Sequence, residues 1–434
     1  MANAEERLSL ERCRTLAIEN NVAVKNSTLE SESADKIKQA AFTKYFPQIK
    51  AGGALFNNRD PLIRESIPSG NLPVYDGNPT NLFTANQFAY FPGLDMGLLE
   101  KGEVYYLTIT QPLFAGGRIV NGNRLAALGQ KVSLLKIRMS EEEVLISTEE
   151  QYFQIVSLDE KRKTIGRYEA LLSTLLHQVE DAFKNGISLK NDVLKVRQKK
   201  SEVELNRSRI ENGRELALMS FCQYIGVDYS PSIILTDRVT VADAPEGFRV
   251  KDETAAVASR PEYQLLQIAA GAEILQSKIK RGEYLPEVGV GVAAMQMQFD
   301  DREREENRVF FATAAIPISA WWEASYTLKE RKLREAMENN REKDTTERLL
   351  LQIKKAWKDV EESYKQLGIC EISKKQAEEN LALSQDSYEN GIVDIADLLE
   401  AQAIFQKSQE ELIEAKVNCR IKKKIYLKTS GKRF

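Results

Sequence analysis

The chain has 434 residues, of which 29% are charged, and its formal net charge at pH 7 is −3. No stretch resembles a membrane-spanning helix of about 20 apolar residues. A net negative charge gives no general attraction to nucleic acid, so we expect no nucleic-acid partner. The only histidine is His177, which excludes histidine-based triads and zinc sites. With four cysteines that lack metal-ligand spacing, we expect no catalytic residue, no metal site and no cofactor.

The first expected element is a helix over roughly residues 7–44, which Pro47 stops because proline lacks a backbone donor. Further along, apolar and polar side chains alternate from Val104 to Gln111. Alternation with aromatic and β-branched residues is typical of a strand. We therefore expect a strand that ends near Pro112.

A very long helix is expected next, because no proline occurs from Ile119 to Phe183 and apolar residues recur at steps of three and four. Such a helix extends roughly 95–100 Å, which points to a coiled-coil assembly. Asn185-Gly186 is expected to end it, since both residues tolerate the left-handed conformation. Asn191 or Ser188 is expected to cap a return helix and complete an antiparallel hairpin.

The same order of elements then occurs again, at fixed offsets. Pro112 and Pro317 are 205 positions apart, as are Asn185-Gly186 and Asn390-Gly391. Upstream, Gly52 and Gly291 are 239 positions apart. The 34 extra positions lie between Pro47 and Pro112, so the first copy has the longer loop. A repeat of this kind predicts one supersecondary unit used twice.

We predict three regions from this repeat. The first copy is 1–226, with a strand pair at about 47–111, and the second is 253–434, with a strand pair at about 286–316. Residues 227–252 between them are expected to be irregular. We expect residues 54–103 to be the outward-facing loop of the first pair and Asp300–Asn307 its shorter counterpart.

Four expected strands cannot cover their own edges, whereas closure into a barrel removes all edges. Alternating faces with aromatic residues nearby are typical of outer-membrane barrel strands. We identify the following as candidate membrane-interface aromatics: Tyr105, Tyr106, Phe310, Phe311, Trp321 and Trp322. The alternative is that these rings fill a soluble core.

Several short motifs occur in both copies in the same order. They are Asn20-Asn21 and Arg260-Pro261-Glu262, Tyr-x-Pro before each first strand, QPLFAGG at 111–117, and the turns FKNGISLKNDVL and YENGIVDIADLLEAQ. None is specific alone, but their repetition at fixed spacing is. On these motifs the chain resembles the TolC-like outer-membrane efflux proteins (outer membrane factors) over residues 7–431.

The resemblance implies a mainly α fold with a β-barrel part. Three chains form a twelve-stranded outer-membrane β-barrel continued by a long α-helical barrel, and 227–252 is an equatorial segment between two structural repeats. The implied partners are two further copies (a homotrimer), a periplasmic adaptor (membrane fusion) protein, an inner-membrane pump of RND or ABC type, and outer-membrane lipid. The implied location is the outer membrane of a Gram-negative bacterium, extending into the periplasm.

The implied function is a passive exit duct of a tripartite efflux or type I secretion system, gated at its periplasmic helical tip. Residues 1–5 lack the apolar segment of a secretory signal. This beginning fits a cytoplasmic protein or a chain whose leader has been replaced, and the resemblance favours the second. The alternative function is a soluble coiled-coil scaffold that binds helical partners, against which the strands in both copies count.

The resemblance also implies site residues near the two turns. Asp397 and Glu400 share a helix face and match acidic positions of the channel gate, although both also fit an ordinary solvated surface. Asp192 and Tyr388 match members of a tip latch, while Val393 stands where the family has an arginine. The implied adaptor contacts are the turn residues Asn185, Gly186, Asn390 and Gly391.

Overall fold

The computed structural model describes residues 7–74, 87–98, 100–240, 245–300 and 303–432. It is mainly helical with a smaller β part, which confirms the predicted fold class at this level. The chain forms two compact units, each built from both halves of the sequence: Met1–Ile37, Ala127–Glu273 and Arg334–Phe434 in one, Lys38–Ala126 and Ile274–Leu333 in the other. None of the described helices has the length and apolar character needed to cross a membrane.

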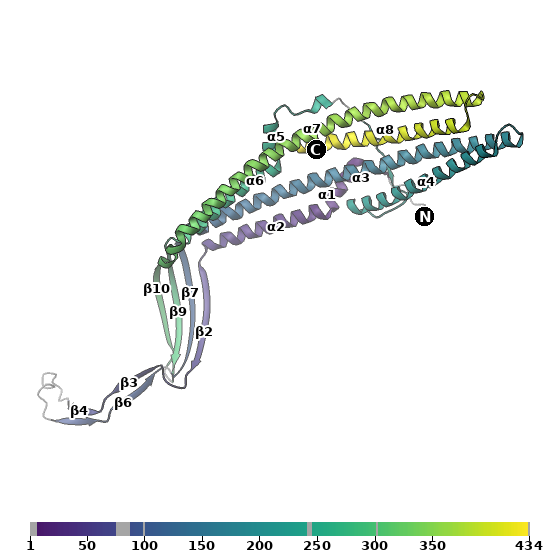
Figure 1. The fold of residues 1–434 in the computed structure, drawn as a ribbon. Helices are drawn as coiled ribbons and strands as arrows, with labels where there is room; N and C mark the ends of the chain where they lie inside the picture. The colour runs from purple at the N-terminus through teal and green to yellow at the C-terminus, as the bar shows by residue number, and fades with distance from the viewer. Residues whose placement is uncertain (1–6, 75–86, 99, 241–244, 301–302, 433–434) are drawn as a thin grey trace. The chain divides into compact units, whose positions relative to one another are not determined.

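The second unit contains an antiparallel sheet of four long strands in the order β10-β9-β7-β2, which lie side by side in Figure 1. Their bounds are β2 Gln48–Asn57, β7 Lys101–Ala115, β9 Glu287–Phe299 and β10 Glu305–Ala315. The central β7–β9 pair joins the two halves of the chain, and it carries an irregularity between Pro112 and Phe114. β2 and β10 are the edge strands of this sheet.

The register gives the sheet two different faces. One row of cross-strand partners runs Ile49, Ile109, Val292 and Phe310, and its neighbours on that side are mostly apolar. We call this side the apolar face. The opposite side, which we call the polar face, carries glycines, threonines and one lysine next to that row: Lys50, Gly52, Thr108, Thr110, Gly289, Gly291 and Thr313. Further along the strands the same side also carries Phe56, Val104, Met295, Met297 and Val309.

On the polar face, aromatic rings lie over glycines of the neighbouring strand. A Cβ added to Gly52 would lie 2.6 Å from Cζ of Tyr106, and one added to Gly291 would lie 2.4 Å from Cζ of Phe311. Both distances are too short for real contacts, so each ring occupies the space that a side chain would need. The two glycines differ by 239 positions and the two rings by 205, which are the offsets read from the sequence.

The predicted loop at 54–103 is more regular than expected, and the expected total of four strands is too low. Four short strands form two ladders there: β3 Ile63–Ile67 with β6 Leu94–Leu98, and β4 Gly70–Pro73 with β5 Phe88–Phe91. Two further strands of two residues each, β1 (Arg7–Leu8) and β8 (Ile234–Leu235), pair in parallel with each other. The glycines and prolines of the segment hid its alternating apolar residues.

The single helix expected at 7–44 is divided into α1 (Leu10–Asn20) and α2 (Val22–Phe42). Asn21 between them is extended, with ψ 132°. The side-chain amides of Asn20 and Asn21 each donate a hydrogen bond of 3.2 Å, to the carbonyls of Ile225 and Tyr224. These two carbonyls belong to the last turn of α4 (Lys190–Ile225), where backbone carbonyls have no hydrogen-bond partner within the helix. The break therefore places donors where the end of another helix needs them.

A second break occurs 239 positions after the first, at Arg260 between α5 (Glu253–Ser259) and α6 (Pro261–Gly282). In each half a glycine with positive φ packs beside the break. A Cβ on Gly226 (φ 71°) would lie 2.4 Å from Cβ of Asn20, and one on Gly431 (φ 73°) would lie 2.0 Å from Oγ of Ser259. At both positions glycine is therefore required, because the backbone has a positive φ and because a side chain would overlap the neighbouring residue.

The longest helices are α3 (Arg118–Lys184, 67 residues) and α7 (Trp321–Glu389, 69 residues). At 1.5 Å per residue each extends about 100 Å. Arg207 pairs with Glu169 and Arg197 with Glu180, both at 2.7 Å, so α4 runs antiparallel to α3 as a hairpin. α7 and α8 (Ile395–Thr429) form the second hairpin (Figure 1).

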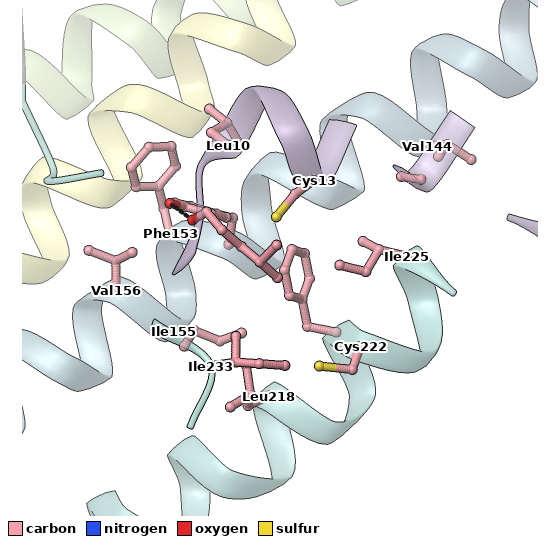
Figure 2. Packing of buried hydrophobic residues seen from close by; sticks show 14 of the residues in the cluster. Leu10, Cys13, Val144, Phe153, Ile155, Val156, Leu218, Cys222, Ile225 and Ile233 are labelled. Atoms are coloured by element: carbon pink, nitrogen blue, oxygen red, sulfur yellow. Dashed lines mark hydrogen bonds between the residues drawn. The ribbon is translucent and has the colours of Figure 1, made fainter. Parts of the chain in front are cut away.

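A buried cluster joins α1, α3 and α4 with the segment that follows α4 (Figure 2). Phe153, Phe221 and Cys13 are completely buried in it. The hydroxyl of Tyr152 has two acceptors for its single proton, the carbonyl of Leu8 at 3.0 Å and Oδ2 of Asp237 at 2.8 Å. Asp237, in the segment that follows α4, is thus tied to α3 through a partly buried polar contact.

We expect Gly226→Ala to lower the free energy of unfolding by about 1–3 kcal/mol, because alanine is strained at positive φ and its methyl group meets Asn20. The measurement is denaturant-induced unfolding followed by far-UV circular dichroism. Gly213→Ala is the matched control in the same helix, where an added Cβ has no neighbour within 4 Å. Equal stability of the two variants would contradict the argument.

Candidate functional site

The two hairpins turn in the same way. Gly186 (φ 78°) follows α3 and Gly391 (φ 74°) follows α7. The next amides, of Ile187 and Ile392, each donate a 2.9 Å hydrogen bond back to Ala182 and Ser387 respectively. These contacts bind carbonyls that the helix itself leaves free, so the asparagine–glycine motifs end both helices as predicted.

The turn asparagines stabilise the helix ends from which they come. Nδ2 of Asn185 donates to the carbonyl of Asp181, and Nδ2 of Asn390 donates to that of Asp386, both at 2.8 Å. Their side-chain amides are therefore engaged within each turn. What the turns offer to a partner is their outer surface.

That outer surface is apolar, which the sequence interpretation missed. Ile187 is 82% exposed, Ile392 75% and Leu189 70%. Large exposed aliphatic side chains grouped at one place usually mark an interaction surface. The signal was present in the sequence, since isoleucine follows asparagine–glycine in both copies.

Behind the turns, one buried cluster holds the two hairpins together. It includes Leu172 and Val179 of α3, Val196 of α4, and Ile395 and Leu398 of α8. All five side chains are at most 2% exposed. The tip of the first hairpin is thereby packed against that of the second.

α4 begins at Lys190, so neither Ser188 nor Asn191 is its N-cap, contrary to the prediction. Leu189 occupies that position. Asp192 replaces the missing cap by accepting hydrogen bonds from the Leu189 amide and from Oγ of Ser188, both at 3.2 Å. The carboxylate of Asp192 is thus engaged with its own hairpin.

α8 begins with a true N-cap, Asp394, which the sequence interpretation did not single out. Its Oδ1 accepts from the amides of Ala396 (2.6 Å) and Asp397 (3.1 Å). These amides, first that of Asp397, hold the pKa of Asp394 below its ordinary value of 3.8. An aspartate directly before an apolar run is the sequence signal that identifies such a cap.

A lysine connects the two helix starts. Nζ of Lys195 lies 3.8 Å from Oδ1 of Asp192 and 3.9 Å from Oδ2 of Asp394. It therefore neutralises acidic groups of both hairpins at the tip. The position equivalent to Lys195 in the second copy, 205 residues later, is Glu400.

Tyr388 packs against the tip cluster near Asp192. Burial, and then the negative charge of Asp192, raises the pKa of the Tyr388 hydroxyl. The two residues matched to the latch are therefore neighbours in a single chain. The hydrogen bonds found for Asp192 nevertheless go to Leu189 and Ser188.

Asp397 and Glu400 lie in the first turns of α8 and are both exposed. The neighbouring Leu398 and Leu399 are buried in the tip cluster, so the two carboxylates project from the opposite side of the helix. Within the part of the chain that the structure describes, neither carboxylate has an ion-pair partner. They therefore form a local negative charge that is not ion-paired among the described residues.

The six candidate interface aromatics are divided among three places. Tyr105 and Phe310 lie on the apolar face, with Tyr105 over Gly53, whereas Tyr106 and Phe311 lie on the polar face over Gly52 and Gly291. Trp321 and Trp322 begin α7, where the Trp321 Nε1–H donates to the Tyr284 carbonyl at 2.8 Å and Trp322 is 81% exposed. Sequence clustering could not separate the two faces, because adjacent residues on a strand point in opposite directions.

Residues 256–423 match the family described as outer membrane efflux protein. No curated protein matches the chain by sequence. The fold is similar to the CmeC outer membrane channel of Campylobacter jejuni, with 14% identity, a TM-score of 0.75, and coverage of 97% of this chain and 85% of that one. It is also similar to the outer membrane protein VceC of Vibrio cholerae, with 13% identity, a TM-score of 0.73, and coverage of 98% and 96%.

A third similar structure is the MtrE outer membrane channel of Neisseria gonorrhoeae, with 14% identity and a TM-score of 0.74 over 98% of this chain and 89% of that one. At such identities the similarity establishes the fold, and the family match adds a sequence relationship over the second half. The predicted resemblance to the TolC-like outer-membrane efflux proteins is thereby confirmed.

We expect Asp394→Asn to remove a pH dependence of tip stability. The depressed pKa of Asp394 means that its contribution is present above pH 3.8 and is lost as the pH falls through the lower folded-state pKa. Asparagine still caps the helix but carries no charge. Hydrogen exchange at the start of α8 should therefore differ between the two proteins at pH 6, and the difference should disappear as the pH falls through the lowered folded-state pKa of Asp394. A difference that does not change with pH below 3.8 would contradict this assignment.

Proposed function

We propose that this protein, which resembles the outer membrane efflux proteins in sequence and in fold, is a trimeric outer-membrane channel. It serves as the passive exit duct of a tripartite efflux or type I secretion system. The observation that carries the proposal is the sheet, which combines an apolar face with two unpaired edges. A soluble scaffold has no use for this combination.

The trimer follows from the edges. The outer backbone groups of β2 and β10 need partners, and in a bilayer no water is available to supply them. Pairing β2 of one copy with β10 of the next closes three four-stranded sheets into a twelve-stranded barrel. The apolar face then meets lipid, and the polar face with Lys50 and the threonines lines the channel.

The helices continue this channel into the periplasm. Helices of about 100 Å arranged as two hairpins per copy suit a hollow α-barrel of three chains. The two halves act as two structural repeats, 1–226 and 253–434, with 227–252 as an equatorial segment. In support, the helix breaks, the positive-φ glycines and the ring-over-glycine pairs each recur at the sequence offsets.

The tip carries the gate. Three copies of Asp397 and Glu400 around a narrow axis place up to six carboxylates close together, which favours cations and resists closure. The first hairpin avoids this repulsion, since Lys195 stands where the second has Glu400. Asp192 and Tyr388 form the latch, and Lys195 with Asp394 takes over the role of the family's arginine, which is Val393 here.

The turns bind the periplasmic adaptor, which connects the duct to an inner-membrane pump of RND or ABC type. The exposed Ile187, Leu189 and Ile392 supply the apolar surface that such a contact needs. Gly186 and Gly391 set the shape of the two turns beneath it. The implied location is a Gram-negative outer membrane, with the helices in the periplasm.

In detergent, we expect light scattering to give a protein mass of three chains. Cysteines introduced by Ser188→Cys or Val393→Cys should crosslink to an adaptor hairpin, because both positions lie at the turns. The control is Leu216→Cys, because Leu216 is exposed on α4 but lies well away from the turn that precedes this helix. A monomer or dimer in detergent, or crosslinks from Leu216→Cys alone, would overturn the proposal.

The double variant Asp397→Asn, Glu400→Gln should lower the cation-to-anion permeability ratio and the sensitivity to divalent block in planar bilayers, because it removes the carboxylate rings. The double variant Glu347→Gln, Glu371→Gln, which removes two exposed carboxylates of α7, is the control for the change in total charge. Asp192→Asn or Tyr388→Phe should instead raise the resting conductance by loosening the tip. Unchanged selectivity in the double variant would make Asp397 and Glu400 ordinary surface residues.

A further inference from the structure

The β3–β6 ladder is a two-stranded ribbon with one apolar side. Ile63 pairs with Leu98 and Ile67 with Leu94, and these four side chains share a face because partners and alternate residues point the same way. Met96 lies between them, opposite Glu65. We call this the apolar ribbon face.

This face is exposed in a single chain. Ile63 is 47% exposed, Ile67 42%, Leu94 44% and Met96 37%. The other side of the ribbon is polar, with Arg64 opposite Gly97 and Ser66 opposite Asp95. An isolated two-stranded ribbon is marginally stable in water unless further strands or a packing partner cover its apolar side.

The base of the ribbon is fixed to the sheet rather than loosely joined. Asp300, after β9, adopts a left-handed conformation (φ 53°) that is unusual for a residue other than glycine. Its Oδ1 accepts from the amides of Glu100 (2.8 Å) and Lys101 (3.1 Å), and its own amide donates to the Lys101 carbonyl at 2.8 Å. The residues that follow the ribbon are thus held at the start of β7.

We propose that the apolar ribbon faces of three copies pack against one another around the threefold axis, with β3 of each copy beside β6 of the next. The inference rests on the proposed trimer. In this arrangement three ribbons cover their apolar faces and their strand edges at the same time. The occupant of the surface is therefore two further copies of this chain.

Charge and connectivity both support this occupant. Arg64 belongs to β3 and pairs with Asp60 of its own chain at 3.3 Å, and Asp95 belongs to β6. A head-to-tail ring therefore adds a second carboxylate near Arg64 at each contact between copies. The strand that leads into the ribbon is β2, which in the proposed barrel pairs with the neighbouring copy. The ribbon contact therefore continues an interface that the barrel already forms.

Glu65 should destabilise the contact between the three ribbons, and this effect can be measured. It is the one charged residue of the apolar ribbon face, and three copies of it would approach one another near the axis. Glu65→Gln should therefore raise the temperature at which the detergent-solubilised trimer dissociates, whereas Met96→Asp should lower it. A ribbon without this contact would leave the dissociation temperature of both variants unchanged.

The direct test is crosslinking with a short bis-maleimide, which joins two thiols. In a Cys370→Ser background, where the three remaining native cysteines are buried, we expect Met96→Cys to give a covalent dimer. Ser66→Cys, on the polar side of the same ribbon, is the matched control and should remain monomeric on a denaturing gel. Dimers from both positions or from neither would overturn the inference.

Two further measurements separate the possible failures. A fluorophore attached through Met96→Cys and quenched by brominated lipid would show that the membrane covers the face, which also overturns the inference. Light scattering on the same variants tests the trimer independently. A trimer without the Met96→Cys crosslink refutes only the ribbon contact, whereas the absence of a trimer refutes the proposed function.

Discussion

The amides and carbonyls along the outer edges of β2 and β10 need hydrogen-bond partners, and this requirement governs the assembly of the protein. Among the described residues, the order β10-β9-β7-β2 leaves each edge strand of this sheet with a single neighbour. The apolar face adds a second requirement, since it needs lipid or another apolar surface. In the proposed trimer, closure of three sheets into a barrel satisfies both requirements, and the function proposed for the helices depends on that closure.

The two halves of the chain use the same kinds of contact between glycines and neighbouring side chains. A ring lies over a glycine in each half, at Gly52 and Gly291. A helix break in each half receives the glycine that follows a long hairpin, Gly226 or Gly431. In each pair the glycine and the side chain beside it hold two separate segments of the chain in contact. A substitution at either residue therefore disturbs the packing of both segments.

The tips are similar in backbone but differ in charge. Both turns place a glycine at positive φ and an isoleucine in solvent. The first hairpin then has Lys195 beside its acidic residues, whereas the second has Glu400 and leaves Asp397 without a partner in the described chain. A duplicated framework has thus given one hairpin that holds the tip together and one that supplies negative charge.

Sequence alone determined the features that depend on local chemistry. Proline and asparagine–glycine positions located the ends of the long helices, and the offsets of 205 and 239 identified the repeat, because backbone conformation at such residues hardly depends on distant contacts. Tertiary structure alone decided which strands are neighbours and therefore that Tyr105 and Tyr106 lie on opposite faces with different partners. It also decided the break at Asn21, whose amide caps a helix about 200 residues away, and the Lys195 bridge between hairpins. These depend on contacts between distant segments, which local patterns of residues do not encode.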